Sequence, residues 1–102
     1  IDISGTGCGS NEYASNNGTV IAAGWRNDYG YHVIINHNNG YSTLYGHMSR
    51  VAVKVGMTVA RGQVIGYMGN TGDSYGCHLH FEIWKGIPFT GTRINPLPYL
   101  MR

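Results

Sequence analysis

The sequence predicts an all-β fold, a compact single domain of mostly antiparallel short strands. Strand-sized apolar runs recur between turn signals, whereas the 3.6-residue periodicity of helices is absent. The composition agrees, because the 102 residues include 16 glycines and 8 tyrosines and only 12% are charged, as expected of a turn-rich β protein. We expect a two-layer or barrel-sandwich-like arrangement with a groove that holds the functional site.

The expected strands follow one another along the chain, each bounded by glycine, asparagine or proline. Asn38-Asn39-Gly40 separates two of them and is a strong hairpin signal. The polar loop 70–76 leads into the last strand, and Pro88, Pro96 and Pro98 mark a tail that we expect to be rich in loops. The expected strands are 18–23, 31–36, 41–45, 51–55, 63–67 and 77–84.

Length and charge exclude several classes of protein. The 102 residues form one domain, 1–102. A net charge of +2 without a basic run gives little support for nucleic-acid binding, although a weakly basic surface suits an anionic polymer such as a bacterial cell wall. No apolar run approaches the ~20 residues of a membrane span. Because the chain begins at Ile1 rather than Met, we expect a piece of a longer protein, truncated at its N-terminus, which leaves room for additional domains upstream.

The two cysteines, Cys8 and Cys77, lie far apart in the sequence and form no CxxC pair. They are either two unrelated buried thiols or a disulfide that ties the loop after Asp2 to the strand that carries His78 and His80. A disulfide would imply an oxidising compartment outside the cytosol.

His78-Leu79-His80 is the most informative stretch of the chain. Alternate residues of a strand share a face, so the two imidazoles project to the same side. A hydrolytic zinc needs three protein ligands and an open position for a water, whose pKa it lowers to about 7. Asp2 and His80 are credible ligands, while His47 and His78 would flank the water, take its proton and stabilise the developing oxyanion. This reasoning leaves the third ligand unassigned.

Several ordered motifs together carry a family resemblance that covers nearly the whole chain. They are 33–49, 53–56, 62–66, 69–72, 78–82 and Asn95-Pro96, with 1–3 and 18–20 as the amino-terminal block. This set resembles the lysostaphin-type, LytM-like zinc metallopeptidases. The resemblance implies an antiparallel β fold and cleavage of peptide bonds in peptidoglycan.

The resemblance also implies a role for each matching residue. Asp2 matches the carboxylate of the family's His-x-x-x-Asp motif, and His80 matches the second histidine of His-x-His, so both would bind zinc. His78 and His47 would act in catalysis, through attack of a zinc-bound water on a peptide carbonyl. The first histidine of the family's motif would lie upstream of Ile1, which leaves the zinc site one ligand short. The implied location is extracellular, at the cell wall, or on a phage virion.

Two other functions remain open. A non-catalytic relative could bind the cell wall or a partner protein through the same groove. A biotinyl or lipoyl carrier domain is the weaker alternative, because neither Lys54 nor Lys85 has the flanking residues of a modifiable lysine. The sequence does not say which peptide bond would be cleaved.

Three further polar residues near these motifs carry expectations of their own. We expect His37, at the hairpin turn, to be structural or solvent-facing rather than catalytic, and His32 to be an exposed strand residue. Glu82 shares the face of His78 and His80, where it would either orient an imidazole or lie as a charge at the rim.

Overall fold

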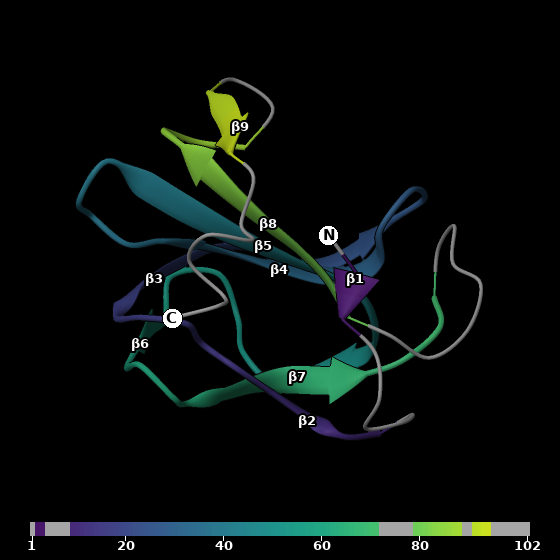
Figure 1. Ribbon diagram of the computed structural model, residues 1–102. Helices are drawn as coiled ribbons and strands as arrows, with labels where there is room; N and C mark the ends of the chain where they lie inside the picture. The colour runs from purple at the N-terminus through teal and green to yellow at the C-terminus, as the bar shows by residue number, and fades with distance from the viewer. Residues whose placement is uncertain (1, 4–8, 72–78, 89–90, 95–102) are drawn as a thin grey trace.

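The computed structural model in Figure 1 describes residues 2–3, 9–71, 79–88 and 91–94. These residues form strands and no helix, which confirms the all-β prediction. In this part of the chain there is accordingly no helix that could cross a membrane. The strands are β1 (Asp2–Ile3), β2 (Asn11–Tyr13), β3 (Gly18–Arg26), β4 (Gly30–Asn36), β5 (Tyr41–Val51), β6 (Thr58–Val59), β7 (Val64–Met68), β8 (Leu79–Lys85) and β9 (Thr92–Ile94).

The strands pair antiparallel in the order β1-β8-β5-β4-β3-β6, with β9 beside β8. Strand β5 belongs to two layers. Its residues 41–46 pair with β8, whereas Met48, Arg50 and Val51 pair with β7. Strand β7 in turn pairs with β2, so β2 and β7 form a second layer, which lies below the main row of strands in Figure 1.

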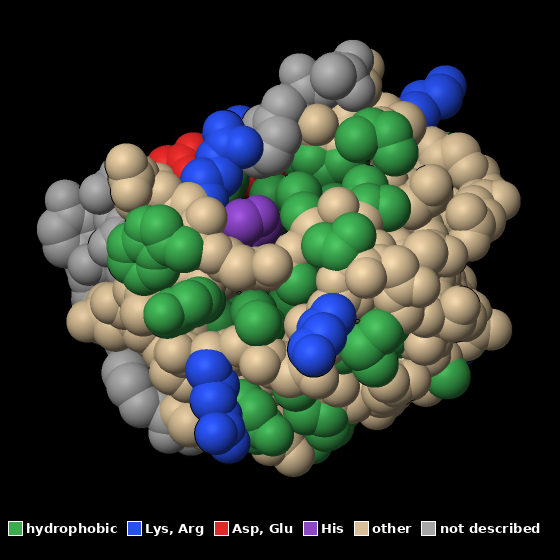
Figure 2. Space-filling model, turned by 180° about the vertical axis from the view of Figure 1, so that it is seen from behind, with side chains coloured by type: hydrophobic (Ala, Val, Ile, Leu, Met, Phe, Trp, Pro, Cys, Tyr) green, Lys and Arg blue, Asp and Glu red, His purple; other side chains and the backbone are tan. Residues whose placement is uncertain are grey.

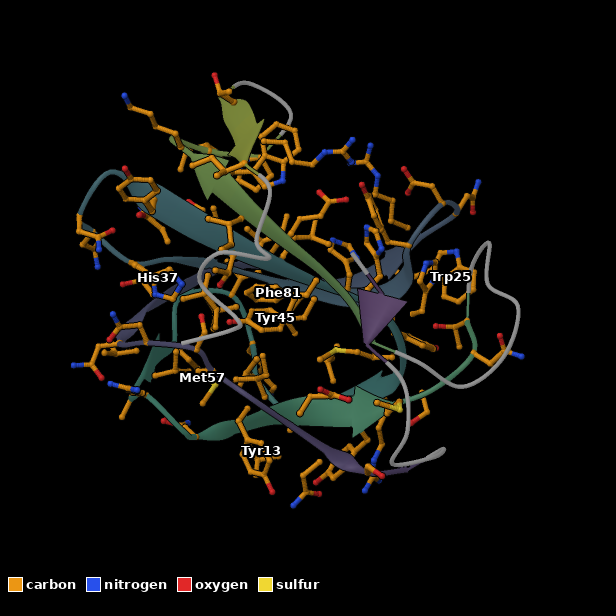
Figure 3. All side chains as sticks on the ribbon, viewed as in Figure 1. Tyr13, Trp25, His37, Tyr45, Met57 and Phe81 are labelled. Carbon is orange, nitrogen blue, oxygen red and sulfur yellow. The ribbon has the colours of Figure 1, made fainter. Side chains whose placement is uncertain are left out.

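The core fills the space between the two layers. Tyr45 of β5 and Phe81 of β8 point toward one another there, with ring centroids 5.4 Å apart (Figure 3). The hydroxyl of Tyr45 is buried but satisfied, because it donates to Ser15 Oγ at 2.9 Å and accepts from the hydroxyl of Thr43 at 2.8 Å. The remaining core side chains are apolar: Ala14, Val20, Val33, Ile35, Met48, Val53, Val59, Ile65 and Met68.

The hairpin between β4 and β5 forms where the sequence predicts it. Asn38 and Gly40 both have positive φ, at 60° and 89°, a region that glycine enters freely and asparagine tolerates. The turn is closed by side-chain caps, with the backbone N–H of Asn38 donating to Asn36 Oδ1 and that of Tyr41 donating to Asn39 Oδ1. The sequence signal therefore has a direct local cause.

The expected strand 51–55 is wrong. Strand β5 ends at Val51, and the following residues form a loop. Val53 is buried in the core from this loop, whereas Val55 is 63% exposed, so the alternation of valines reflects one anchored side chain rather than a strand. Gly56, with φ 93°, then turns the chain, and its N–H donates to Val20 O at 2.8 Å.

Two other local expectations need correction. The tail after Pro88 contains a strand, β9, whose residues pair with β8 from Ile83 to Lys85. His32 is buried rather than exposed, because it lies on the central strand β4, and its Nδ1 is 3.3 Å from the carbonyl of Gly30. The sequence around His32 did not reveal that β4 is an interior strand, flanked by β3 and β5.

Lys and Arg side chains are scattered over the face seen from behind, among hydrophobic and uncharged groups (Figure 2). On the described surface of that face they do not merge into one basic patch. This distribution agrees with the small net charge of +2.

Candidate active site

The site is built around a β-bulge in β5. Val33 of β4 pairs with Tyr45, but Tyr31 pairs with Met48, so β5 has one extra residue in this interval. His47 occupies it with φ 58°, a value that is uncommon for a residue other than glycine. A bulge of this kind changes the direction of a side chain without ending the strand. It brings the ring of His47 to within 5.6 Å of the ring of His80, measured between centroids.

Gly46 permits the close packing beside this bulge. A Cβ at this position would lie 3.1 Å from Cδ1 of Tyr29 and 3.6 Å from Cβ of His80. The backbone N–H of His47 also donates to the carbonyl of Tyr29 at 2.6 Å. Strand β5 and the β3–β4 turn therefore meet closely at Gly46. Any side chain larger than the hydrogen of glycine would displace the Tyr29 ring.

The tautomer of His47 is set by Thr71. Nδ1 of His47 lies 2.6 Å from the carbonyl oxygen of Thr71, and because a carbonyl can only accept, Nδ1 carries the proton. In the neutral imidazole the lone pair is then on Nε2. The hydroxyl of Thr71 donates in turn to the carbonyl of Met48, which anchors the loop after β7 to β5.

A second cluster surrounds Glu82 on β8. His80 and Glu82 are two residues apart and share a face, and His80 Nε2 lies 2.6 Å from Glu82 Oε2. The same oxygen accepts from the hydroxyl of Tyr29 at 2.7 Å, and Oε1 accepts from Trp84 Nε1 at 2.8 Å. Arg93 of β9 adds a longer contact of 3.4 Å. The carboxylate is therefore enclosed by donors.

These donors decide the protonation state of Glu82, whose side chain is only 1% exposed. Burial alone raises the pKa of Glu82, but hydrogen bonds from His80, Tyr29 and Trp84 outweigh it and lower the pKa to about 2. An ionised Glu82 that accepts from His80 Nε2 leaves the lone pair of the neutral imidazole on Nδ1. Of the two roles expected for Glu82, the structure favours orientation of an imidazole over a charge at the rim.

Tyr29 is the site residue that the sequence analysis missed. Its ring packs beside both histidines, with centroids 5.4 Å from His80 and 6.2 Å from His47. Burial, followed by the hydrogen bond to Glu82, raises the pKa of Tyr29, so its hydroxyl keeps the proton that it donates. Tyr29 and Glu82 are 53 positions apart, and no spacing in the sequence connects them.

For the other expected site residues the structure describes only the backbone of Asp2. The backbone of Asp2 is directly opposite His80 in the pairing of β1 with β8. Opposite residues of antiparallel strands are neighbours on one face of a sheet, with Cβ atoms about 4.5–5.5 Å apart. His78, Cys8 and Cys77 lie outside the described residues. Within those residues, no three His, Cys, Asp or Glu side chains gather as a metal site would require.

The donor set nevertheless suits a zinc ion. His80 Nε2 is bound to a carboxylate, the arrangement that orients metal-binding histidines in proteins. The backbone of Asp2 lies opposite His80 in the register, and zinc accepts aspartate oxygen as well as histidine nitrogen. The described residues thus contain one oriented nitrogen donor, with the backbone of an aspartate opposite it.

A cavity of about 370 Å³ lies elsewhere in the fold. It includes His37 and Thr43, toward the end of the sheet opposite Trp25 (Figure 3), and none of His47, His80 and Glu82. His37 donates from Nδ1 to Asn17 O at 2.8 Å, and its Nε2 is 2.7 Å from Thr43 Oγ1. The structural role expected for His37 is therefore confirmed.

Comparisons with known proteins identify the family. The model of peptidase family M23 matches residues 1–96. Peptidoglycan DD-endopeptidase ShyA of Vibrio cholerae serotype O1 is 42% identical over 88 residues, or 85% of this chain and 20% of that protein. The catalytic domain of the antimicrobial peptidase lysostaphin from Staphylococcus simulans matches 99% of this chain and 77% of its own, with a TM-score of 0.87 and 33% identity.

A third similar protein is a zinc containing peptidase from Vibrio cholerae, with a TM-score of 0.71 and 40% identity over 74% of this chain and 23% of that one. The chain spans only about a fifth of the length of the curated relative ShyA. The matched region, in contrast, includes the whole of the described fold and the residues around the β5 bulge. The chain therefore belongs to peptidase family M23.

Proposed function

We propose that this chain is a zinc-dependent endopeptidase domain that hydrolyses peptide bonds in peptidoglycan cross-links or bridges. The observation that carries the proposal is the convergence of His47 and His80 on one site, each with its tautomer set by a partner. Membership of peptidase family M23 supports the reaction class. The names of ShyA and lysostaphin, one a peptidoglycan endopeptidase and the other an antimicrobial peptidase, support the substrate class.

Asp2 and His80 would hold the zinc ion, together with a histidine that we expect in the parent protein four residues before Asp2. When bound, zinc supplies a Lewis acid that polarises the scissile carbonyl and lowers the pKa of a water. By accepting from Nε2 of His80, Glu82 would leave Nδ1 as the atom of His80 available to bind zinc. Tyr29 and Trp84 also donate hydrogen bonds to Glu82, so protein groups rather than solvent orient its carboxylate.

His47 would act as the base. Because Nδ1 donates to Thr71, the Nε2 lone pair is available to take a proton, and the resulting imidazolium would stabilise negative charge that develops on the substrate. His78 lies outside the described residues, and we propose it as the second catalytic histidine because its spacing from His80 predicts that the two share a face. We place the protein outside the cytoplasm, at the cell wall or on a phage virion, because that is where the substrate is accessible.

The test is digestion of purified sacculi by the parent protein and its variants, measured as release of peptide-bearing fragments. We expect His47→Ala and His78→Ala to lower the rate at least about a hundredfold, the usual size of a lost acid–base contribution, while circular dichroism stays unchanged. His37→Gln is the matched control, since His37 makes structural contacts at the far end of the sheet.

Wild-type rates in both His47→Ala and His78→Ala would refute the assigned site. If the wild-type protein itself sediments with sacculi but releases nothing after zinc is added, the protein is the non-catalytic wall-binding relative instead.

A further inference from the structure

Two aromatic side chains at the end of the β3–β4 hairpin form an exposed pair that the active site does not use. Trp25 and Tyr31 are directly opposite in the strand register, and their rings meet edge to face with centroids 5.2 Å apart. Trp25 is 55% exposed and Tyr31 is 39% exposed. Figure 3 shows Trp25 at the end of the sheet away from His37. We call this pair the aromatic platform.

The aromatic platform is held in place before any ligand arrives. The indole N–H of Trp25 donates to Asn27 Oδ1 at 3.1 Å, and the backbone N–H of Tyr31 donates to Thr71 Oγ1 at 3.1 Å. The first contact orients the Trp25 indole, and the second fixes the backbone that carries the Tyr31 ring. Side chains that are ordered in advance lose less entropy on binding, so such a platform favours recognition.

The platform is continuous with the candidate active site through one residue. The side chain of Thr71 binds the backbone of Tyr31, while its carbonyl accepts from Nδ1 of His47 at 2.6 Å. Thr71 therefore links the backbone of the platform directly to the ring of His47.

The chemistry of the platform selects an uncharged ring. Arg26 and Asp28 flank it, and they form an ion pair at 2.8 Å in which each neutralises the other. Exposed Trp and Tyr rings contribute large flat apolar areas with little conformational freedom. Of the two components of peptidoglycan, the stem peptides carry carboxylates, whereas the glycan consists of N-acetylated pyranose rings that each present an apolar face.

We propose that Trp25 and Tyr31 form a subsite for a sugar ring of the glycan strand that bears the scissile peptide. This proposal rests on the proposed function, because it assigns the substrate of the same site. The enzyme would then prefer peptides that are still attached to glycan over free peptides of the same sequence.

Binding is tested without turnover. The chain carrying His47→Ala is titrated with the tetramer of N-acetylglucosamine, and the indole N–H signals of Trp25 and Trp84 are followed by NMR. We expect a saturable shift of the Trp25 signal in the chain with Trp25 intact. By isothermal titration calorimetry we expect an affinity about tenfold weaker in Trp25→Leu, a loss of about 1.4 kcal/mol. Tyr41→Ala is the matched control, because Tyr41 is 40% exposed but lies at the other end of the sheet.

Kinetics give the second readout. With the parent protein, Trp25→Leu and Tyr31→Ala should each lower the ratio of kcat/KM for glycan-linked to sugar-free peptides about tenfold, mainly through KM, as expected when a binding contact is lost. Two variants are used so that misfolding of one leaves the test intact.

The outcomes separate the two proposals. Cleavage of sacculi with no sugar-dependent shift of Trp25 and no change in the ratio overturns the subsite and leaves the endopeptidase standing. A saturable shift in a protein that cleaves no sacculi supports the subsite and rejects the endopeptidase. Equal loss of affinity in Tyr41→Ala and Trp25→Leu overturns the assignment to the aromatic platform.

Discussion

Two buried glutamates show how differently a carboxyl group behaves when donors surround it and when they do not. Glu82 and Glu12 are 1% and 6% exposed. Three hydrogen bonds keep Glu82 ionised, whereas Oε1 of Glu12 has no hydrogen-bond partner among the described residues. Desolvation by burial accordingly raises the pKa of Glu12 to about 7. The alternation of polar and apolar residues in a sequence cannot distinguish these cases, because the donors to Glu82 come from distant segments.

Glu12 should make the stability of the protein depend on pH. Its pKa rises from 4.5 to about 7 on folding, so its contribution to the free energy of unfolding is fully present below pH 4.5 and is lost as the pH rises through 7. The loss above pH 8 is at most about 3 kcal/mol, at 1.36 kcal/mol per pKa unit. Urea unfolding of wild type and Glu12→Gln at pH 5 and pH 8.5 measures it. The gap between the two proteins should widen in favour of Glu12→Gln at the higher pH, and a constant gap would contradict the prediction.

At the scale of elements, the sequence predicts a strand correctly where alternation and turn residues mark it locally. It fails where pairing with a neighbouring strand determines how far the strand extends. Strands β3, β4, β7 and β8 and the β4–β5 hairpin follow from alternation and turn residues. Strand β5 was expected to span only 41–45, yet the strand continues through the bulge because β7 and β8 both pair with it. His47 and His80 were identified from their motifs, but Tyr29 was not, since only the tertiary fold brings it to Glu82.

Gly46→Ala tests the close packing at the bulge. The added methyl group would lie 3.1 Å from the Tyr29 ring, so the ring must move and its hydrogen bond to Glu82 must lengthen. Overpacking of this kind costs about 1–3 kcal/mol. We expect a matching fall in the free energy of unfolding, together with a lower kcat on sacculi, measured at a temperature where the variant is fully folded. Unchanged stability and kcat would show that the gap accepts a methyl group.

At the scale of the whole molecule, the site is assembled from both ends of the described chain. Asp2 on β1 pairs with His80 on β8, so the amino-terminal strand reaches the site only when the central strands are formed. The family, the fold and two of the site histidines could be inferred from ordered motifs in the sequence. The register that puts Asp2 beside His80 depends on two short segments 78 positions apart, which no local pattern encodes.

Zinc should therefore stabilise the whole fold rather than one strand. A ligand that binds only the folded state adds about 4 kcal/mol when its concentration is 1,000 times Kd. For the parent protein we expect chelation to lower Tm by several degrees and added zinc to restore it. Asp2→Asn should shrink this difference, whereas Asp28→Asn, at an ion pair outside the site, should preserve it. A Tm that is insensitive to chelation in the wild type would argue against the zinc site.

Because β5 pairs in both layers, the candidate site can form only when both layers have formed. His47 lies in the bulge between the part of β5 that pairs with β8 and the part that pairs with β7. If either layer is unformed, the pairing on one side of the bulge is lost. His47 and His80 are then no longer aligned with one another. Folding of both layers and alignment of the two histidines are thereby coupled, so a partly folded chain lacks an assembled site.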